Sequence, residues 1–207
     1  VNLIADVLEY EVKCNDAALE RAGGLPLRVT VFHGHKPPNI SVRAFLDRIR
    51  IFGGCSACCF VLGIRYVERL QNSDAAYHIN SFNMHRLLLA GIMVAAKFVD
   101  DFYFSNNYWS KVGGLPNDEL NALEIEFLFL MRFELHTTRS DYDEFVSGLR
   151  RRHERNNERN NEHNIEHNAL QHHQRTTPTH APTHARGHLG LSSSASSSTL
   201  QSLVNVS

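Results

Sequence analysis

The sequence predicts an all-α protein in which a helical bundle is followed by a polar tail. Apolar residues recur at three- and four-residue spacing up to about Leu149, which is typical of amphipathic helices. No alternating apolar pattern is long enough to build a sheet. Beyond this point the composition changes to Arg, Asn, His, Thr and Ser, which cannot form a core. The 207 residues therefore comprise one core-forming part and a tail.

Six segments carry the helical pattern, and several begin at residues that favour helix starts. The expected helices are 3–21, 42–53, 57–71, 84–100 and 116–133, followed by one from 141. Ser41 is a suitable N-cap, and Pro116 suits the first turn of a helix. The helix over 57–71 is apolar on most sides, so we expect it at the centre of the bundle. Residues 102–115 should form an irregular connection with one short turn at 107–111.

These elements divide the chain into three parts. Residues 1–24 should form an N-terminal helix that packs on the bundle, and residues 25–150 should form the bundle itself. The low-complexity tail, residues 151–207, is expected to be disordered because it has too few apolar residues to offset chain entropy. Some helix over 150–170 would extend the preceding helix, but without packing it would be marginal.

Composition and charge exclude several classes of protein. The net charge of −1 argues against a general nucleic-acid binder, and no apolar run has the length of a membrane span. The cysteines, which do not form a disulfide framework, are Cys14, Cys55, Cys58 and Cys59. A reduced intracellular protein, in the nucleus, the cytoplasm or both, fits this pattern best. Because the chain begins with Val, we expect a fragment or a processed form.

The sequence offers few candidates for catalysis or metal binding. Residues 55–59, CSACC, have the C-x-x-C spacing of a zinc half-site, but no second cysteine pair follows. We interpret these residues as small buried cysteines, and Asp100-Asp101 as a solvated helix end. The histidines of the tail can bind metals adventitiously. A phosphate-binding loop and a serine-nucleophile motif are both absent. We therefore expect no enzyme, cofactor, resident metal or small-molecule substrate.

Two charged residues lie on otherwise apolar helices. Lys97 continues the line Arg86, Ala90, Met93, which differs from the line through Leu87, Leu88, Gly91, Ala95 and Phe98 that is the better core face. Glu124 lies between Leu120 and Phe127 at the same spacing. Spacing alone favours side chains that simply reach solvent. The alternative is a partner surface with a cation, an anion and apolar side chains between them.

Three stretches of the chain, 32–49, 79–115 and 119–135, together resemble the cyclin box of P-type cyclins. This group contains the yeast phosphate-regulatory cyclins and the plant U-type cyclins. The motifs NSFN-x-HRLL, AAKF-x-DD and KVGG occur in this order and make the middle stretch specific. The resemblance covers about residues 5–149 and includes the N-terminal helix.

The resemblance implies a five-helix cyclin-box bundle with an extra N-terminal helix and a regulatory, non-enzymatic role. Such cyclins bind a cyclin-dependent protein kinase and activate it by docking on its αC helix, in cell-cycle or nutrient-linked control. Lys97 and Glu124 match the Lys–Glu pair that hydrogen-bonds kinase backbone. The expected kinase-binding residues are Lys97, Glu124, Met93, Arg86 and Phe127. The alternative is a cyclin-fold adaptor that binds a partner without activating a kinase.

One position of the cyclin-box pattern stays open. Arg43 and Arg48 each fit the place of a cyclin-box arginine, and the sequence does not choose between them. Glu68 is a plausible buried partner for one of the two.

Overall fold

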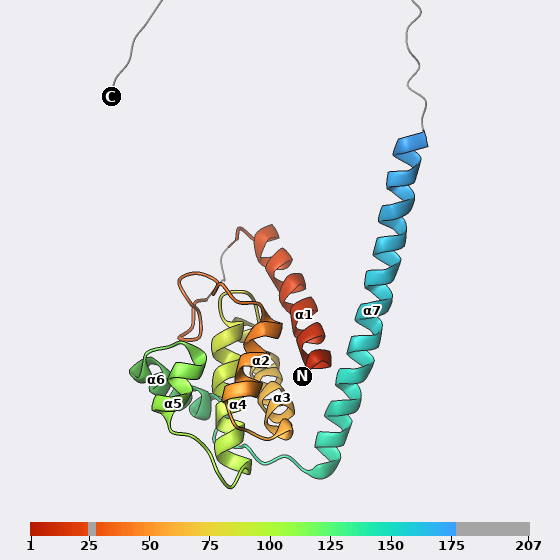
Figure 1. The fold of residues 1–207 in the computed structure, drawn as a ribbon. Helices are drawn as coiled ribbons and strands as arrows, with labels where there is room; N and C mark the ends of the chain where they lie inside the picture. Colours follow the sequence, from red (N-terminus) through yellow and green to blue (C-terminus); the bar gives the residue numbers. More distant parts are fainter. Residues whose placement is uncertain (25–27, 177–207) are drawn as a thin grey trace, which may run out of the picture. The chain divides into compact units, whose positions relative to one another are not determined.

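The computed structural model describes residues 1–24 and 28–176, and all regular structure among them is helical. The helices are α1 (Asn2–Arg21), α2 (Val42–Phe52), α3 (Ala57–Ser73), α4 (Met84–Val99), α5 (Asn106–Gly113), α6 (Asn117–Leu130) and α7 (Arg139–Thr176), with a 3₁₀ turn η1 (Ala75–Tyr77) after α3 (Figure 1). This arrangement confirms the all-α prediction and the five-helix box α2–α6 behind a leading helix. Within the described residues, no helix combines the length and apolar character that a membrane crossing requires.

Helices α3 and α4 form the centre of the box. Every residue from Leu87 to Ala96 on α4 is buried, and α4 lies between α3 and the pair α5 and α6 (Figure 1). The two helices touch at Gly63 and Gly91, where a Cβ atom added at Gly91 would lie 2.8 Å from the carbonyl oxygen of Gly63. Glycine is therefore required for this close approach. The sequence predicted only 57–71 as the central helix, whereas α4 is buried on more of its surface.

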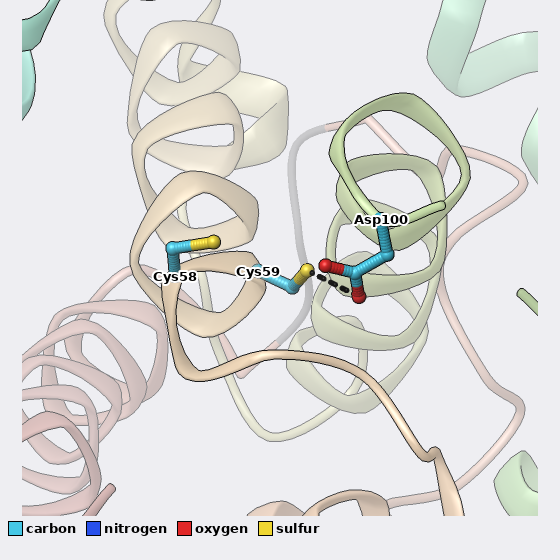
Figure 2. A group of neighbouring side chains, drawn as sticks. All are labelled: Cys58, Cys59 and Asp100. Atoms are coloured by element: carbon cyan, nitrogen blue, oxygen red, sulfur yellow. Dashed lines mark hydrogen bonds between the residues drawn. The ribbon is translucent and has the colours of Figure 1, made fainter. Parts of the chain in front are cut away.

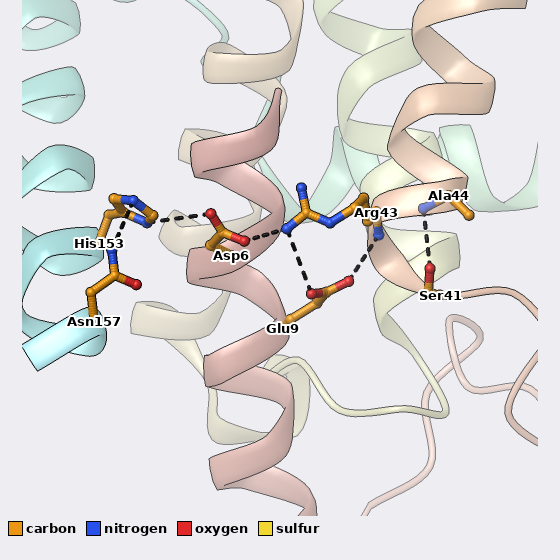
Figure 3. A network of polar contacts seen from close by, with 7 residues as sticks. All are labelled: Asp6, Glu9, Ser41, Arg43, Ala44, His153 and Asn157. Atoms are coloured by element: carbon orange, nitrogen blue, oxygen red, sulfur yellow. Dashed lines mark hydrogen bonds and ion pairs between the residues drawn. The ribbon is translucent and has the colours of Figure 1, made fainter. Parts of the chain in front are cut away.

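Helix α1 is held against the box by apolar packing and by a polar network (Figure 3). Its inner face buries Ile4, Ala5, Val7 and Leu8. The Arg43 side chain on α2 donates to the Asp6 carboxylate, and its backbone N–H donates to Oε1 of Glu9 over 3.1 Å. On the other side of Asp6, Nδ1 of His153 lies 3.6 Å from Oδ2 of this carboxylate. Helices α1, α2 and α7 therefore meet around Asp6.

The structure shows different partners for Arg43 and Arg48, the two candidates for the cyclin-box arginine. Arg43 pairs with Asp6 of α1, whereas Arg48 donates to the backbone oxygen of Lys111 over 2.9 Å. Neither contacts Glu68, which instead pairs with Arg152 of α7 at 3.2 Å. The predicted partnership with Glu68 is therefore wrong, because Arg152 of α7 pairs with Glu68 while Arg43 and Arg48 have other partners.

The helix boundaries differ from prediction at two places around the α4–α6 region. Residues 106–113 form a complete short helix, α5, which ends at Gly114 in the left-handed conformation (φ 71°). The prediction placed only a turn there. Helix α6 ends at Leu130 rather than Phe133, because Arg132 and Phe133 also have positive φ (53° and 59°). A left-handed pair of residues cannot continue an α-helix.

Helix α7 begins at Arg139, slightly before the predicted start at 141, and extends further than predicted. It packs Phe145 and Leu149 against the core and continues to Thr176. The helix thus includes the expected extension over 150–170. The expectation of disorder for residues 177–207 lies outside the described residues.

Candidate functional site

Lys97 and Glu124 converge. Lys97 lies in the last turn of α4, where this otherwise apolar helix leaves the core, and Glu124 lies in the middle of α6. The Lys97 ammonium donates to Oε1 of Glu124 over 2.6 Å. The side chains are 25% and 15% exposed, so the pair is largely sheltered but still reachable from solvent. The two helices, distant in sequence, therefore place an ion pair at one point on the surface.

Two asparagines complete this cluster. The Lys97 ammonium also donates to Oδ1 of Asn106, the first residue of α5. The Asn106 amide in turn donates to Oε2 of Glu124 over 2.6 Å and to Oδ1 of Asn121 over 2.7 Å. Sequence reasoning missed Asn106 and Asn121 because it expected an irregular segment before residue 115. No local signal marked Asn106, since the N-cap of α5 is Ser105 and the Asn106 side chain bonds to another helix.

The cluster keeps hydrogen-bonding capacity for a partner. An ammonium group has three N–H donors, and two of those of Lys97 have acceptors among the described residues. Each oxygen of the Glu124 carboxylate accepts one hydrogen bond and can accept another. Because the side chains fix one another, a partner that adds one acceptor and one donor would have little ordering entropy to overcome.

The other three predicted site residues are not part of the Lys97–Glu124 cluster. Arg86 forms a second ion pair between α4 and α6, with Glu119, and is 21% exposed. Met93 and Phe127 are fully buried, and the Phe127 ring packs edge-on against Phe32 at 6.2 Å between centroids. Direct contact of Met93 or Phe127 with a partner is therefore incompatible with this structure. Helical spacing placed Met93 beside Lys97 on a surface, but α4 is covered on that side by its neighbours.

Exposed aromatic residues surround the end of α4. Phe98, which spacing assigned to the core face, is 51% exposed, and Phe102 is 90% exposed. Further large apolar side chains are exposed on this connection and on α6 and its end, namely Val99, Tyr103, Phe104, Ile125, Phe129 and Phe133. Exposed apolar side chains that gather in this way mark interaction surfaces. We call the exposed residues Phe98, Val99, Phe102, Tyr103 and Phe104 the α4-end patch.

Comparison with known proteins points to one family. Residues 10–135 match the family described as Cyclin. The chain is 40% identical over 151 residues to Cyclin-U4-1 of Arabidopsis thaliana, covering 73% of this chain and 74% of that protein. It is 36% identical over 151 residues to Cyclin-P4-1 of Oryza sativa subsp. japonica, covering 72% and 71%. With Cyclin-U4-3 of Arabidopsis thaliana the identity is 40% over 120 residues, but this match spans only 55% of that relative.

Proposed function

Because the chain belongs to the cyclin family, in the group of the plant U- and P-type cyclins, we propose that it binds a cyclin-dependent protein kinase and activates it. The observation that supports this proposal most is the convergence of Lys97 and Glu124 beside the α4-end patch. By resemblance to the cyclin-box pattern, Lys97 and Glu124 would correspond to the Lys–Glu pair that contacts kinase backbone in that family.

The chemistry of the pair suits recognition of a backbone. A carbonyl oxygen of the kinase would accept the remaining N–H of Lys97, and a backbone N–H would donate to the Glu124 carboxylate. Charge-assisted hydrogen bonds of this kind are stronger than neutral ones. Since they read main-chain groups, they tolerate different kinase side chains. The ion pair would thus supply register rather than selectivity among kinases.

The α4-end patch would supply the apolar area of the interface. Phe98 follows Lys97 directly, and the Phe102 side chain is almost fully exposed. Aromatic residues are enriched at the cores of protein interfaces, where their burial contributes much of the affinity. A rigid helical surface that presses on the αC helix would place the glutamate of that helix against the ATP-binding lysine of the kinase.

A direct test measures binding and activation together. The recombinant chain is mixed with each member of a panel of cyclin-dependent kinases, and both complex formation and the rate of substrate phosphorylation are recorded. The proposal predicts that at least one kinase binds and phosphorylates faster. Lys97→Ala should weaken both effects, whereas Lys13→Ala, at an exposed lysine of α1, should leave them unchanged.

The outcome also separates an activator from an adaptor. Binding that depends on Lys97 without any rise in phosphorylation rate would favour a cyclin-fold adaptor and contradict activation. No binding to any kinase of the panel would contradict the proposal as a whole.

A further inference from the structure

Two thiols and a carboxylate gather where α3 begins and α4 ends. Cys58 and Cys59 lie in the first turn of α3, and Asp100 follows the last residue of α4 (Figure 2). Their ligand atoms all lie within 4.8 Å of one another, and Sγ of Cys59 is 3.2 Å from Oδ2 of Asp100. Sequence spacing does not connect them, because Asp100 is 41 residues beyond Cys59.

The three groups surround a single point, which the Ser56 hydroxyl marks. Its oxygen lies 3.0 Å from Sγ of Cys58, 3.2 Å from Sγ of Cys59 and 2.5 Å from Oδ1 of Asp100. Zinc binds thiolate sulfur at about 2.3 Å and carboxylate oxygen at about 2.0–2.2 Å. Once the Ser56 hydroxyl rotates away, small side-chain rotations would bring the three atoms to those distances.

Cys55 is the candidate for a fourth ligand, because it has the spacing that zinc sites use. It precedes Cys58 in a C-x-x-C arrangement, and its side chain would have to turn to bring its sulfur to the other three ligand atoms, which already lie within 4.8 Å of one another. Cys55, Cys58 and Asp100 are only partly buried, so an ion can reach the cluster from solvent.

We propose that Cys55, Cys58, Cys59 and Asp100 form a tetrahedral binding site for Zn²⁺. Three sulfurs and one carboxylate oxygen are ligands that zinc accepts, and their number completes a closed, structural site. On binding, each thiol releases its proton to solvent, and the Ser56 hydroxyl gives up its place between the ligands. The ion would clamp the start of α3 to the end of α4, three residues after Lys97.

A simpler interpretation needs no metal. Asp100 accepts hydrogen bonds from the backbone N–H (2.9 Å) and the hydroxyl of Ser56, and so caps α3 from another helix. The thiols would then only fill space. The two interpretations predict different results in a metal titration. Thiols that only pack against their neighbours would not bind one equivalent of a metal ion.

Cobalt is the probe that separates this site from the histidines of the tail. The full chain is stripped of metal, kept reduced with a phosphine and titrated with Co²⁺, which replaces Zn²⁺ with the same geometry. Thiolate ligands give an intense near-ultraviolet charge-transfer band, and tetrahedral geometry gives strong visible bands. Imidazole ligands give no thiolate band. The proposal predicts one equivalent of Co²⁺ with both signatures, displaced by Zn²⁺.

Matched variants identify the ligands. Cys58→Ser and Asp100→Asn should each weaken Zn²⁺ binding by more than the roughly 10- to 100-fold that loss of a hydrogen-bond partner behind a ligand can cause. Cys14→Ser, at an exposed cysteine of α1, should bind as the wild type does. Zn²⁺ should also raise the Tm of the wild type and of Cys14→Ser, since it binds the folded state.

Two results would overturn the proposal. One is a wild-type chain that shows no thiolate band with Co²⁺, which would assign any binding to the tail. The other is a band of equal strength in Cys58→Ser and Cys14→Ser when circular dichroism shows both variants folded. If Cys58→Ser does not fold, the wild-type titration and the Tm shift decide alone.

Discussion

His85, in the first turn of α4, illustrates how one buried ring makes stability depend on pH. Its Nε2 donates to the backbone oxygen of Ile40 over 2.9 Å, and its ring packs edge-on against Phe45. The other ring nitrogen, Nδ1, is buried and has no hydrogen-bond partner among the described residues. Protonation would place a charge there without an acceptor, so burial lowers the pKa of His85. Burial likewise lowers the pKa of His33.

The lowered pKa values predict that acid weakens the fold. Below about 6.5, the ordinary pKa of histidine, the unfolded chain binds protons that the folded chain excludes. The free energy of unfolding should therefore be highest above this pH and fall as the pH drops from about 7 towards 5. His85→Gln, which can still donate to Ile40, should flatten this slope in urea titrations. His35→Gln, at an exposed histidine, is the control, and equal slopes in both variants would contradict the assignment.

Single residues also show where sequence reasoning stops. Spacing separated Lys97 from the core face but favoured a side chain that reaches solvent, and only the family resemblance joined Lys97 to Glu124. Asn106 was missed because nothing in a turn-rich segment indicates which side chain faces a neighbouring helix. Met93 was misplaced because periodicity distinguishes faces of one helix, whereas burial depends on how many other helices cover them.

At the scale of elements, the crossing of α3 and α4 sets the geometry of the site, because Lys97 is carried by α4. The backbones touch at Gly63 and Gly91, with Phe127 of α6 against the same spot. Helix α4 carries the small residues Ala90, Gly91, Ala95 and Ala96, which permit close approach of another backbone. The partner helix and the point of contact could not be predicted, since they depend on the arrangement of the whole bundle.

Replacing Gly91 tests this crossing. In an isolated helix, alanine in place of glycine stabilises by roughly 0.5–1 kcal/mol. Gly91→Ala should instead destabilise by about 1–3 kcal/mol, because its Cβ would meet backbone at 2.8 Å. Gly148→Ala in α7 is the matched control, since its nearest neighbour would be an arginine tip at 3.8 Å. Chemical denaturation measures both, and stabilisation by Gly91→Ala would show that the helices are not in close contact.

Helix α7 is predicted to contribute to the fold through its first part only. Phe145 and Leu149 are buried, and Arg152 and His153 make its last described ion pairs to other helices. Deleting 156–207 should therefore leave the Tm and kinase binding unchanged. Deleting 145–207 should cost about 3–6 kcal/mol from the two apolar side chains. A large fall in Tm for the shorter deletion would show that later residues stabilise the fold.

At the scale of the whole molecule, the helical class and the order of the elements followed from apolar periodicity and helix caps. The contacts between residues that are distant in sequence could not be predicted in this way. The Lys97–Glu124 pair, the Asp6–Arg43 network and the cluster of Cys58, Cys59 and Asp100 each join helices that are separated in sequence. Such contacts depend on how the helices cross one another, and hydrophobic spacing does not predict this geometry.

The central claim is that Lys97 and Glu124 act together on a kinase, and a double-mutant cycle tests it most directly. The dissociation constant of the activated kinase is measured for wild type, Lys97→Ala, Glu124→Ala and the double variant, with Lys13→Ala and Glu20→Ala as exposed controls on α1. Each single change should weaken binding by about 1–3 kcal/mol, with unchanged helical content. The double change should cost less than the sum, because the two side chains are in contact. Affinities equal to those of the controls, in variants that remain folded, would contradict the claim.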